Sequence, residues 1–204
     1  MTLHEEITAE LERIREGWCD PEKGIAIAEK VMQEDCKTCV EIGVFAGKSL
    51  ISAAIGLSKK GDGIIYGVDS WQVSDCLVDV PEADAREWWS HVVNLEGIYN
   101  MFIGNIHASG MAKHIRVLRM TSLDASKVIP SPIDFLHIDG THSEWSSTSD
   151  VCLWLPKIRS GGIVLLDDSN WNSTQTAVRF TEKWCDRLET ITGKESTSTF
   201  FRKR

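Results

Sequence analysis

The sequence predicts an α/β protein built on a doubly wound, Rossmann-like, mostly parallel sheet that ends in an antiparallel hairpin. Short apolar runs alternate along the chain with amphipathic stretches of helical period. Several runs are apolar at successive positions, which is typical of strands covered on both faces. Acidic residues follow these runs, and in such sheets ligands bind beyond the carboxyl ends of the strands. We therefore expect one domain, residues 1–204.

Residues 1–35 are expected to form two helices. The first is amphipathic over 3–15, and the second begins around Asp20-Pro21, where Asp20 can cap the helix and Pro21 suits its first turn. The elements expected after them are strand 38–43, helix 47–58, strand 63–69, strand 115–120, strand 133–139, helix 143–158, strand 161–168 and a helix over about 174–188. A polar turn at Gly193 separates "LETIT" from "STSTFF", which predicts the terminal hairpin.

Residues 72–100 are too long for a plain connection between two elements of the sheet. They carry Pro81 and the pair Trp88-Trp89. Insertions of this length near a ligand-binding face are often lids, and we expect a lid here. Among the other tryptophans, Trp154 and Trp184 are expected in the core because of their helical spacing. The roles of Trp88, Trp89, Trp145 and Trp171 stay open.

The composition excludes several classes of partner. Acidic residues outnumber basic ones by 30 to 22, so neither nucleic acid nor an anionic membrane is an expected partner. The charged amino terminus lacks the apolar core of a signal peptide, and no apolar run is long enough for a membrane helix. Six cysteines without an export signal favour a cytoplasmic protein with reduced thiols, and Cys36 and Cys39 are expected to be buried. A homo-oligomer is left open.

A glycine turn follows the first strand in the stretch "VEIGVFAGKSL", residues 40–50. The turn is one residue too short for a P-loop, and Phe45 stands at the second glycine position of a dinucleotide loop, so both of these sites are excluded. What remains is Glu41-x-Gly43-x-x-x-Gly47-x-Ser49, with Asp69 ending the next strand. Gly43 permits a sharp turn and Gly47 a close approach of the helix to a ligand. Asp69 can accept hydrogen bonds from two ribose hydroxyls, and Glu41 suits a cationic ligand.

A second group of acids lies further along the chain. Asp139 ends one expected strand, and Asp167 and Asp168 end its neighbour in the sheet. Three converging carboxylates repel one another unless a cation lies among them, and oxygen ligands favour Mg²⁺ or another hard divalent cation. The alternative is that these aspartates cap helices. His137-x-Asp139 could also begin an iron site, but no histidine follows His142 in the chain. His137 is expected in a supporting or core position.

These residues resemble a known family. "VEIGVFAGKSL" and "GVDSW" are similar to the first motif and the ribose-binding acid of class I S-adenosylmethionine-dependent methyltransferases. The stretch "IDFLHIDGTHSEWSSTSDVCLWLPKIRSGGIVLLDD" is similar to the metal-dependent O-methyltransferases that act on macrolide sugars and, more distantly, to catechol O-methyltransferase. The resemblance covers residues 38–170 and has no clear counterpart for the 72–100 insertion.

The resemblance implies roles for individual residues. It implies that Asp139, Asp167 and Asp168 bind the metal, and that His142 removes the proton from a substrate hydroxyl. The rate should then fall as the pH drops through the titration of that histidine, near 6.5; the alternative is that His142 caps the following helix. The residues implied at the S-adenosylmethionine site are Glu41, Gly43, Phe45, Gly47, Ser49, Asp69, Ser70, Trp71, Thr121, Ser122 and Asp139. The match is weakest at Thr121 and Ser122, since Met120 replaces the family's usual glycine.

The expected activity is therefore a Mg²⁺-dependent transfer of the methyl group of S-adenosylmethionine to a hydroxyl of a small molecule, such as a sugar of a natural product. Two alternatives remain. One is a non-catalytic partner protein that only binds the cofactor, and the other is a methyltransferase that needs no metal.

Overall fold

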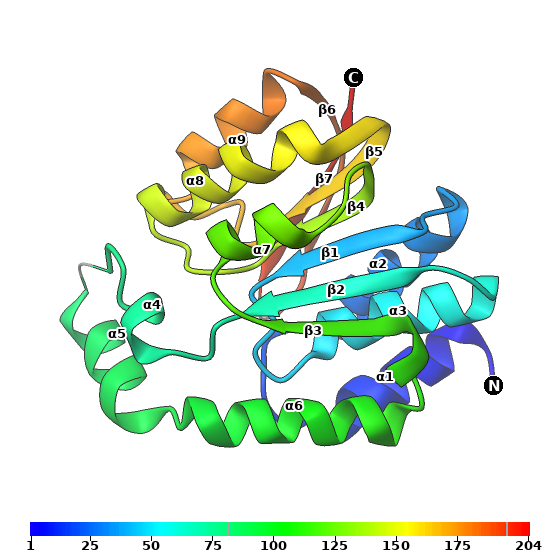
Figure 1. The fold of residues 1–204 in the computed structure, drawn as a ribbon, viewed down its shortest axis with the longest axis horizontal. Coiled ribbons are helices and arrows are strands. Elements are labelled where there is room, and N and C mark those ends of the chain that lie inside the picture. The colour runs from blue at the N-terminus through cyan, green and yellow to red at the C-terminus, as the bar shows by residue number, and fades with distance from the viewer. Residues whose placement is uncertain (81, 195) are drawn as a thin grey trace.

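The computed structural model describes residues 1–80, 82–194 and 196–204. A seven-stranded sheet in the order β3-β2-β1-β4-β5-β7-β6 forms its centre (Figure 1). The strands are β1 (Thr38–Ile42), β2 (Ile64–Asp69), β3 (Ile115–Arg119), β4 (Ile133–Ile138), β5 (Ile158–Leu166), β6 (Cys185–Thr192) and β7 (Thr197–Lys203). The first five are parallel, whereas β7 pairs antiparallel with both β5 and β6. The predicted fold class is confirmed.

Helices cover both faces of the sheet (Figure 1). One face carries α1 (Leu3–Arg13), α2 (Pro21–Gln33), α3 (Lys48–Lys60) and α6 (Leu95–Ser109), and the other carries α7 (Ser122–Val128), α8 (Glu144–Trp154) and α9 (Gln175–Glu182). Successive strand residues enter opposite cores: Phe135 packs with the first helix layer and Leu136 with the second. Both kinds of position are therefore apolar, which explains the continuous apolar runs.

Two expectations differ from the structure. The predicted helix 174–188 ends at Glu182, and the chain enters β6 at Cys185. β6 is an edge strand with mostly exposed residues, so its sequence lacks the apolar pattern of the inner strands. Trp154 is fully buried as expected, but Trp184 lies in the turn between α9 and β6 and is 58% exposed.

The region 72–100 is only partly an insertion. It contains α4 (Val73–Cys76), α5 (Ala83–Glu87) and a π-helical turn (Trp88–Val92), which project from the carboxyl end of β2 (Figure 1). From Leu95 on, the chain forms α6, which packs Leu95 and Phe102 into the core. Pro81, which belongs to the expected lid, lies outside the described residues. None of the described helices is long and apolar enough to cross a membrane.

Candidate functional site

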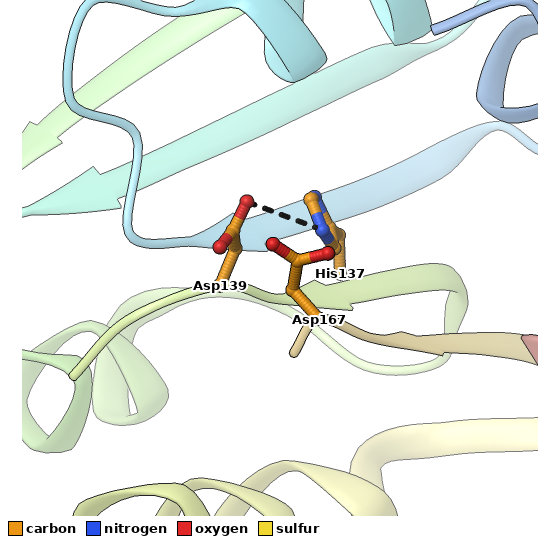
Figure 2. A group of neighbouring side chains, drawn as sticks. All are labelled: His137, Asp139 and Asp167. Atoms are coloured by element: carbon orange, nitrogen blue, oxygen red, sulfur yellow. Dashed lines mark ion pairs between the residues drawn. The ribbon is translucent and has the colours of Figure 1, made fainter. Parts of the chain in front are cut away.

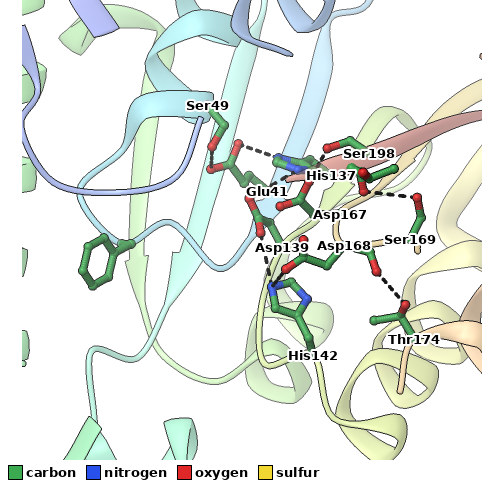
Figure 3. A network of polar contacts seen from close by, with 12 residues as sticks. Glu41, Ser49, His137, Asp139, His142, Asp167, Asp168, Ser169, Thr174 and Ser198 are labelled. Carbon is green, nitrogen blue, oxygen red and sulfur yellow. Dashed lines mark hydrogen bonds and ion pairs between the residues drawn. The ribbon is translucent and has the colours of Figure 1, made fainter. Parts of the chain in front are cut away.

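The strand ends of β1, β4 and β5 bring the expected acids together. These strands are neighbours, and Asp139 follows β4 while Asp167 and Asp168 follow β5. The main chain fixes this arrangement, because the amide of Asp139 donates to the carbonyl of Ile42 (2.8 Å) and the amide of Asp167 to that of Ile138 (3.0 Å). The carboxylates therefore converge at one edge of the sheet, as the sequence predicts (Figure 3).

A buried polar network leads from the glycine turn to these acids. Glu41 is fully buried; it accepts a hydrogen bond from Ser49 Oγ (2.8 Å), and its other oxygen lies 3.1 Å from His137 Nδ1. His137 Nε2 points to Asp139 Oδ2 at 3.5 Å (Figure 2). Glu41 and Ser49 thus contact each other, and their burial leaves little surface for a cofactor. His137 holds the supporting position that the sequence predicts.

Lys23 is a site residue that the sequence did not identify. Its Nζ lies 2.8 Å from Asp167 Oδ1 and 3.1 Å from Asp139 Oδ2, and only 2% of the residue is exposed. Burial alone would lower the pKa of Lys23, but the charges of Asp139 and Asp167 outweigh it and raise the pKa above its ordinary value. Its spacing in the sequence could have indicated its burial. Lys23 precedes Ile27 and Val31 at intervals of four, so all three lie on the buried face of α2.

His142 faces two of the acids from the loop between β4 and α8. Its Nε2 lies 3.3 Å from Asp168 Oδ2 and 3.7 Å from Asp139 Oδ1, and its ring meets that of Trp171 edge to face. The neighbouring Ser143 caps α8 by accepting from the amide of Ser146, so the helix-capping alternative for His142 is excluded. Burial lowers the pKa of His142 to about 4, which keeps the imidazole neutral at pH 7.

The three carboxylates have different electrostatic environments. Burial and the charge of Asp167 raise the pKa values of Asp139 and Asp168, to about 6 for Asp168. Burial would also raise the pKa of Asp167, but Lys23 outweighs it and lowers the value. Ser198 Oγ donates a further hydrogen bond to Asp167. The acid cluster therefore contains one carboxylate that stays ionised and two whose ionisation a cation would favour.

Potential metal ligands form two overlapping groups among the described residues. One consists of His137, Asp139 and Asp167, and the other of His142, Asp167 and Asp168; within each group the ligand atoms lie within 4.8 Å of one another. The predicted set of Asp139, Asp167 and Asp168 is spread over both groups. Asp167 belongs to both of them, so a cation on either side would share this residue.

The glycine turn is held by Asp69. Its Oδ2 accepts from the amides of Val44 and Phe45 (both 3.0 Å), and its Oδ1 accepts from the amide of Trp71 (2.8 Å). Phe45 and Trp71 both have positive φ angles, +50° and +48°, so these bonds stabilise a backbone that side chains disfavour. Asp69 thus has a structural role that the ribose assignment did not include.

Neighbouring atoms leave no space for a side chain at either glycine of the turn. Gly43 has a φ of +83°, and a Cβ atom there would lie 2.1 Å from the carbonyl oxygen of Asp139. Gly47 has a φ of +90°, and its Cβ would lie 2.6 Å from the ring of Phe102. A side chain at position 47 would therefore collide with α6, which is a reason for the glycine that the sequence did not indicate.

The residues expected near adenine are engaged elsewhere. Trp71 is 2% exposed, stacks on Phe102 (5.4 Å between ring centroids) and donates its Nε1 proton to the carbonyl of Phe45 (3.1 Å), so it supports the turn from the core. Ser122 donates to Asp150 and accepts from Trp154 Nε1 (2.8 Å). Thr121 is exposed and caps α7, and Ser70 Oγ accepts from the amide of Gln72. Of these four residues, Trp71 and Ser122 have side chains that bond to other parts of the protein and stabilise the surrounding structure.

Comparisons with known proteins give a family and several similar folds. The family described as "Methyltransferase domain" matches residues 40–169. The O-methyltransferase TomG from Streptomyces achromogenes, solved with S-adenosylmethionine, superposes with a TM-score of 0.66 at 13% identity, covering 100% of this chain and 91% of that chain. An O-methyltransferase from Bacillus cereus, solved with S-adenosylhomocysteine, gives 0.65 at 17% identity (98% and 90% covered), and NovP gives 0.65 at 21% (95% and 78%).

Among curated protein sequences, none matches this chain significantly. The matches that do exist confirm the fold class and the resemblance that the sequence motifs carried.

Proposed function

The chain belongs to the methyltransferase-domain family, and on that premise we propose that it transfers the methyl group of S-adenosylmethionine to a hydroxyl of a small molecule in a Mg²⁺-dependent reaction. One observation carries the proposal: a neutral imidazole, His142, lies 3.3 and 3.7 Å from two carboxylates, Asp168 and Asp139, at the ligand-binding edge of the sheet. The arrangement supports the proposal, because it combines an imidazole that can act as a base with oxygen atoms that suit a hard cation.

The glycine turn and Asp69 are the proposed cofactor site. The turn runs from Gly43 to Gly47 at the end of β1, and TomG and the Bacillus cereus enzyme were solved with S-adenosylmethionine and its demethylated product. Because Glu41 and Ser49 are buried, we assign the direct contacts to Asp69, Asp139 and the backbone of the turn. The turn has no P-loop nest, so ATP is not an expected ligand.

We expect calorimetry to show S-adenosylmethionine binding, and no binding of ATP or NAD. Asp69→Ala should weaken that binding by about 1–3 kcal/mol, because three amides of the turn and its flank lose their acceptor. Asp62→Ala is the control, since it removes an exposed acid near the opposite end of β2. Unchanged affinity in the Asp69 variant, or binding of ATP alone, would count against the site.

The acid cluster fits a divalent cation by its donor chemistry. Lys23 contacts Oδ2 of Asp139 and Oδ1 of Asp167, and Oδ1 of Asp139 and Oδ2 of Asp168 face His142 instead. We propose that Asp139, Asp167 and Asp168 hold Mg²⁺, which prefers oxygen ligands and keeps positions for water or substrate. A bound Mg²⁺ would acidify and orient the substrate hydroxyl.

His142 acts on that hydroxyl in the proposed reaction. Its neutral Nε2 takes the proton as the alcohol oxygen forms a bond to the methyl carbon, while the bond from carbon to sulfur breaks and its electron pair stays on sulfur. Holding the two reactants in line is the other main contribution of the site. The participation of TomG in tomaymycin synthesis supports a natural-product substrate, and we propose a hydroxylated one, such as a sugar.

Metal dependence is tested by turnover with and without a chelator. EDTA should abolish methyl transfer to a panel of hydroxylated acceptors, and Mg²⁺ should restore it. Asp168→Asn should weaken Mg²⁺ binding and lower turnover. The matched control is Asp150→Asn, because Asp150 is also a buried acid whose pKa is raised to about 6 by burial, but it pairs with Ser122 outside the cluster.

The outcomes separate the two alternatives. Full activity in EDTA would identify a methyltransferase that needs no metal. Cofactor binding without transfer to any acceptor would identify a non-catalytic partner protein. Either result would overturn the proposed reaction.

A further inference from the structure

Lys23 lies where an ammonium group is difficult to accommodate. It belongs to the first turn of α2, where the helix dipole disfavours a positive charge, and the residue is only 2% exposed. Its two ion pairs, with Asp139 and Asp167, compensate for both penalties. The acid cluster therefore includes a cation of its own.

This cation divides the cluster into two sides. Of the group His137, Asp139 and Asp167, two members contact Lys23 Nζ, and His137 Nε2 lies 3.5 Å from the same Asp139 oxygen that Lys23 contacts. Figure 2 shows this group at the strand ends. The other group contains His142, Asp168 and the shared Asp167. The two oxygens that face His142 Nε2, Asp168 Oδ2 and Asp139 Oδ1, are oxygens that Lys23 does not contact.

The carboxylates near Lys23 carry more negative charge than this one lysine neutralises. Four carboxylates gather here, Glu41, Asp139, Asp167 and Asp168, and among the described residues Lys23 is the lysine that forms ion pairs with any of them. One ammonium group cannot neutralise four carboxylates, so a divalent ion is still attracted. It must, however, approach against the charge of Lys23.

We propose that Lys23 is a built-in cation that occupies the side of the cluster formed by Asp139 Oδ2 and Asp167 Oδ1, confines the divalent metal to the side where Asp139 Oδ1 and Asp168 Oδ2 face His142, and weakens its binding. The inference rests on the proposed function for the metal itself. In it Lys23 is a positioning residue: it fixes one oxygen each of Asp139 and Asp167 and acts on the metal through them.

The test is the affinity for Mn²⁺, measured by calorimetry and electron paramagnetic resonance on the wild type, Lys23→Met, Lys23→Gln and Lys23→Arg. Loss of the positive charge should tighten Mn²⁺ binding by about tenfold or more, because even water-screened repulsion of a neighbouring divalent ion is of that size. Lys23→Arg keeps the charge and should not tighten binding. Lys30→Met is the matched control: it lies in the same helix but removes an ion pair with Glu189.

Thermal unfolding provides a second measurement. In EDTA, Lys23→Met should unfold at a lower temperature than the wild type, because its acids repel one another, and added Mn²⁺ should raise its melting temperature by more. A purely structural role would lower stability and weaken metal binding together. The opposite signs of the two effects therefore distinguish the proposal.

Each result is decisive. Mn²⁺ binding by the Met and Gln variants no tighter than by the wild type overturns the inference and leaves the metal-dependent function standing. Binding by these variants but not by the wild type supports Lys23 as the resident cation and removes Mg²⁺ from the proposed function. No binding by any form overturns both. If the variants are insoluble in EDTA, recovery of folded protein in Mn²⁺ supports the inference, and no recovery overturns it.

Discussion

Replacing His142 by alanine is expected to lower kcat by about 10²–10⁴, the usual contribution of a general base. The affinity for S-adenosylmethionine should stay within about twofold, because the imidazole acts on the acceptor hydroxyl and not on the sulfonium. His107→Ala, which removes an exposed histidine on α6, is the control. Near-normal turnover in the His142 variant would exclude it as the base.

The pH profile adds a readout to this experiment. The sequence alone suggests an acid limb near pH 6.5, but burial lowers the pKa of His142 to about 4 and, with the charge of Asp167, raises that of Asp168 to about 6. As the pH falls, Asp168 takes up a proton before His142 does and loses its attraction for the cation. The limb should therefore lie near pH 6 and move to lower pH as Mg²⁺ is raised, since protons and metal compete. A limb that ignores Mg²⁺ concentration would contradict this assignment.

Gly43→Ala is expected to destabilise the protein by about 3 kcal/mol or more, or to prevent folding. The new Cβ would lie 2.1 Å from the carbonyl oxygen of Asp139, a main-chain atom that cannot rotate away, and the φ of +83° adds strain. Because the carbonyl belongs to a proposed metal ligand, both cofactor and cation binding should be lost. Chemical denaturation and calorimetry measure these effects.

Gly61→Ala is the control that separates the steric collision at Gly43 from the backbone strain of a positive φ angle. Gly61 has a φ of +93°, similar to that of Gly43, but a Cβ there would have no neighbour within 4 Å. Its substitution should cost only the backbone strain, about 1–2 kcal/mol. If the two variants were equally stable, the close contact between the turn and Asp139 would not exist in solution.

The convergence of the acids could be predicted because it depends on strand ends alone. Asp139 and Asp167 each follow a buried apolar run, and neighbouring parallel strands end at the same edge of a sheet. Which side chains then meet across that edge depends on packing between distant segments. Lys23 lies 116 positions before Asp139, and only the docking of α2 brings the two together.

The same limit applies to the residues expected near the cofactor. Asp69 ends β2 and Trp71 follows it, as the motif requires, but their side chains turn back to the main chain of the glycine turn. The sequence shows that Asp69 is present, but it does not show whether its carboxylate faces solvent or accepts hydrogen bonds from three nearby amides. Likewise α6 (Leu95–Ser109) was not predicted from the sequence; it begins inside the expected lid and continues beyond residue 100.

The buried polar network has a consequence for how the chain can be divided. Side-chain contacts run from Ser49 on α3 through Glu41, His137 and the paired acids to Ser198 on β7, crossing four adjacent strands (Figure 3). The C-terminal hairpin is therefore part of the network that holds the acid cluster. Shortening the chain before Ser198 would remove β7 from the sheet and the hydrogen bond that Ser198 Oγ donates to Asp167, leaving that carboxylate with its ion pair to Lys23. New chain ends are better tolerated at α4 and α5, which lie outside this network.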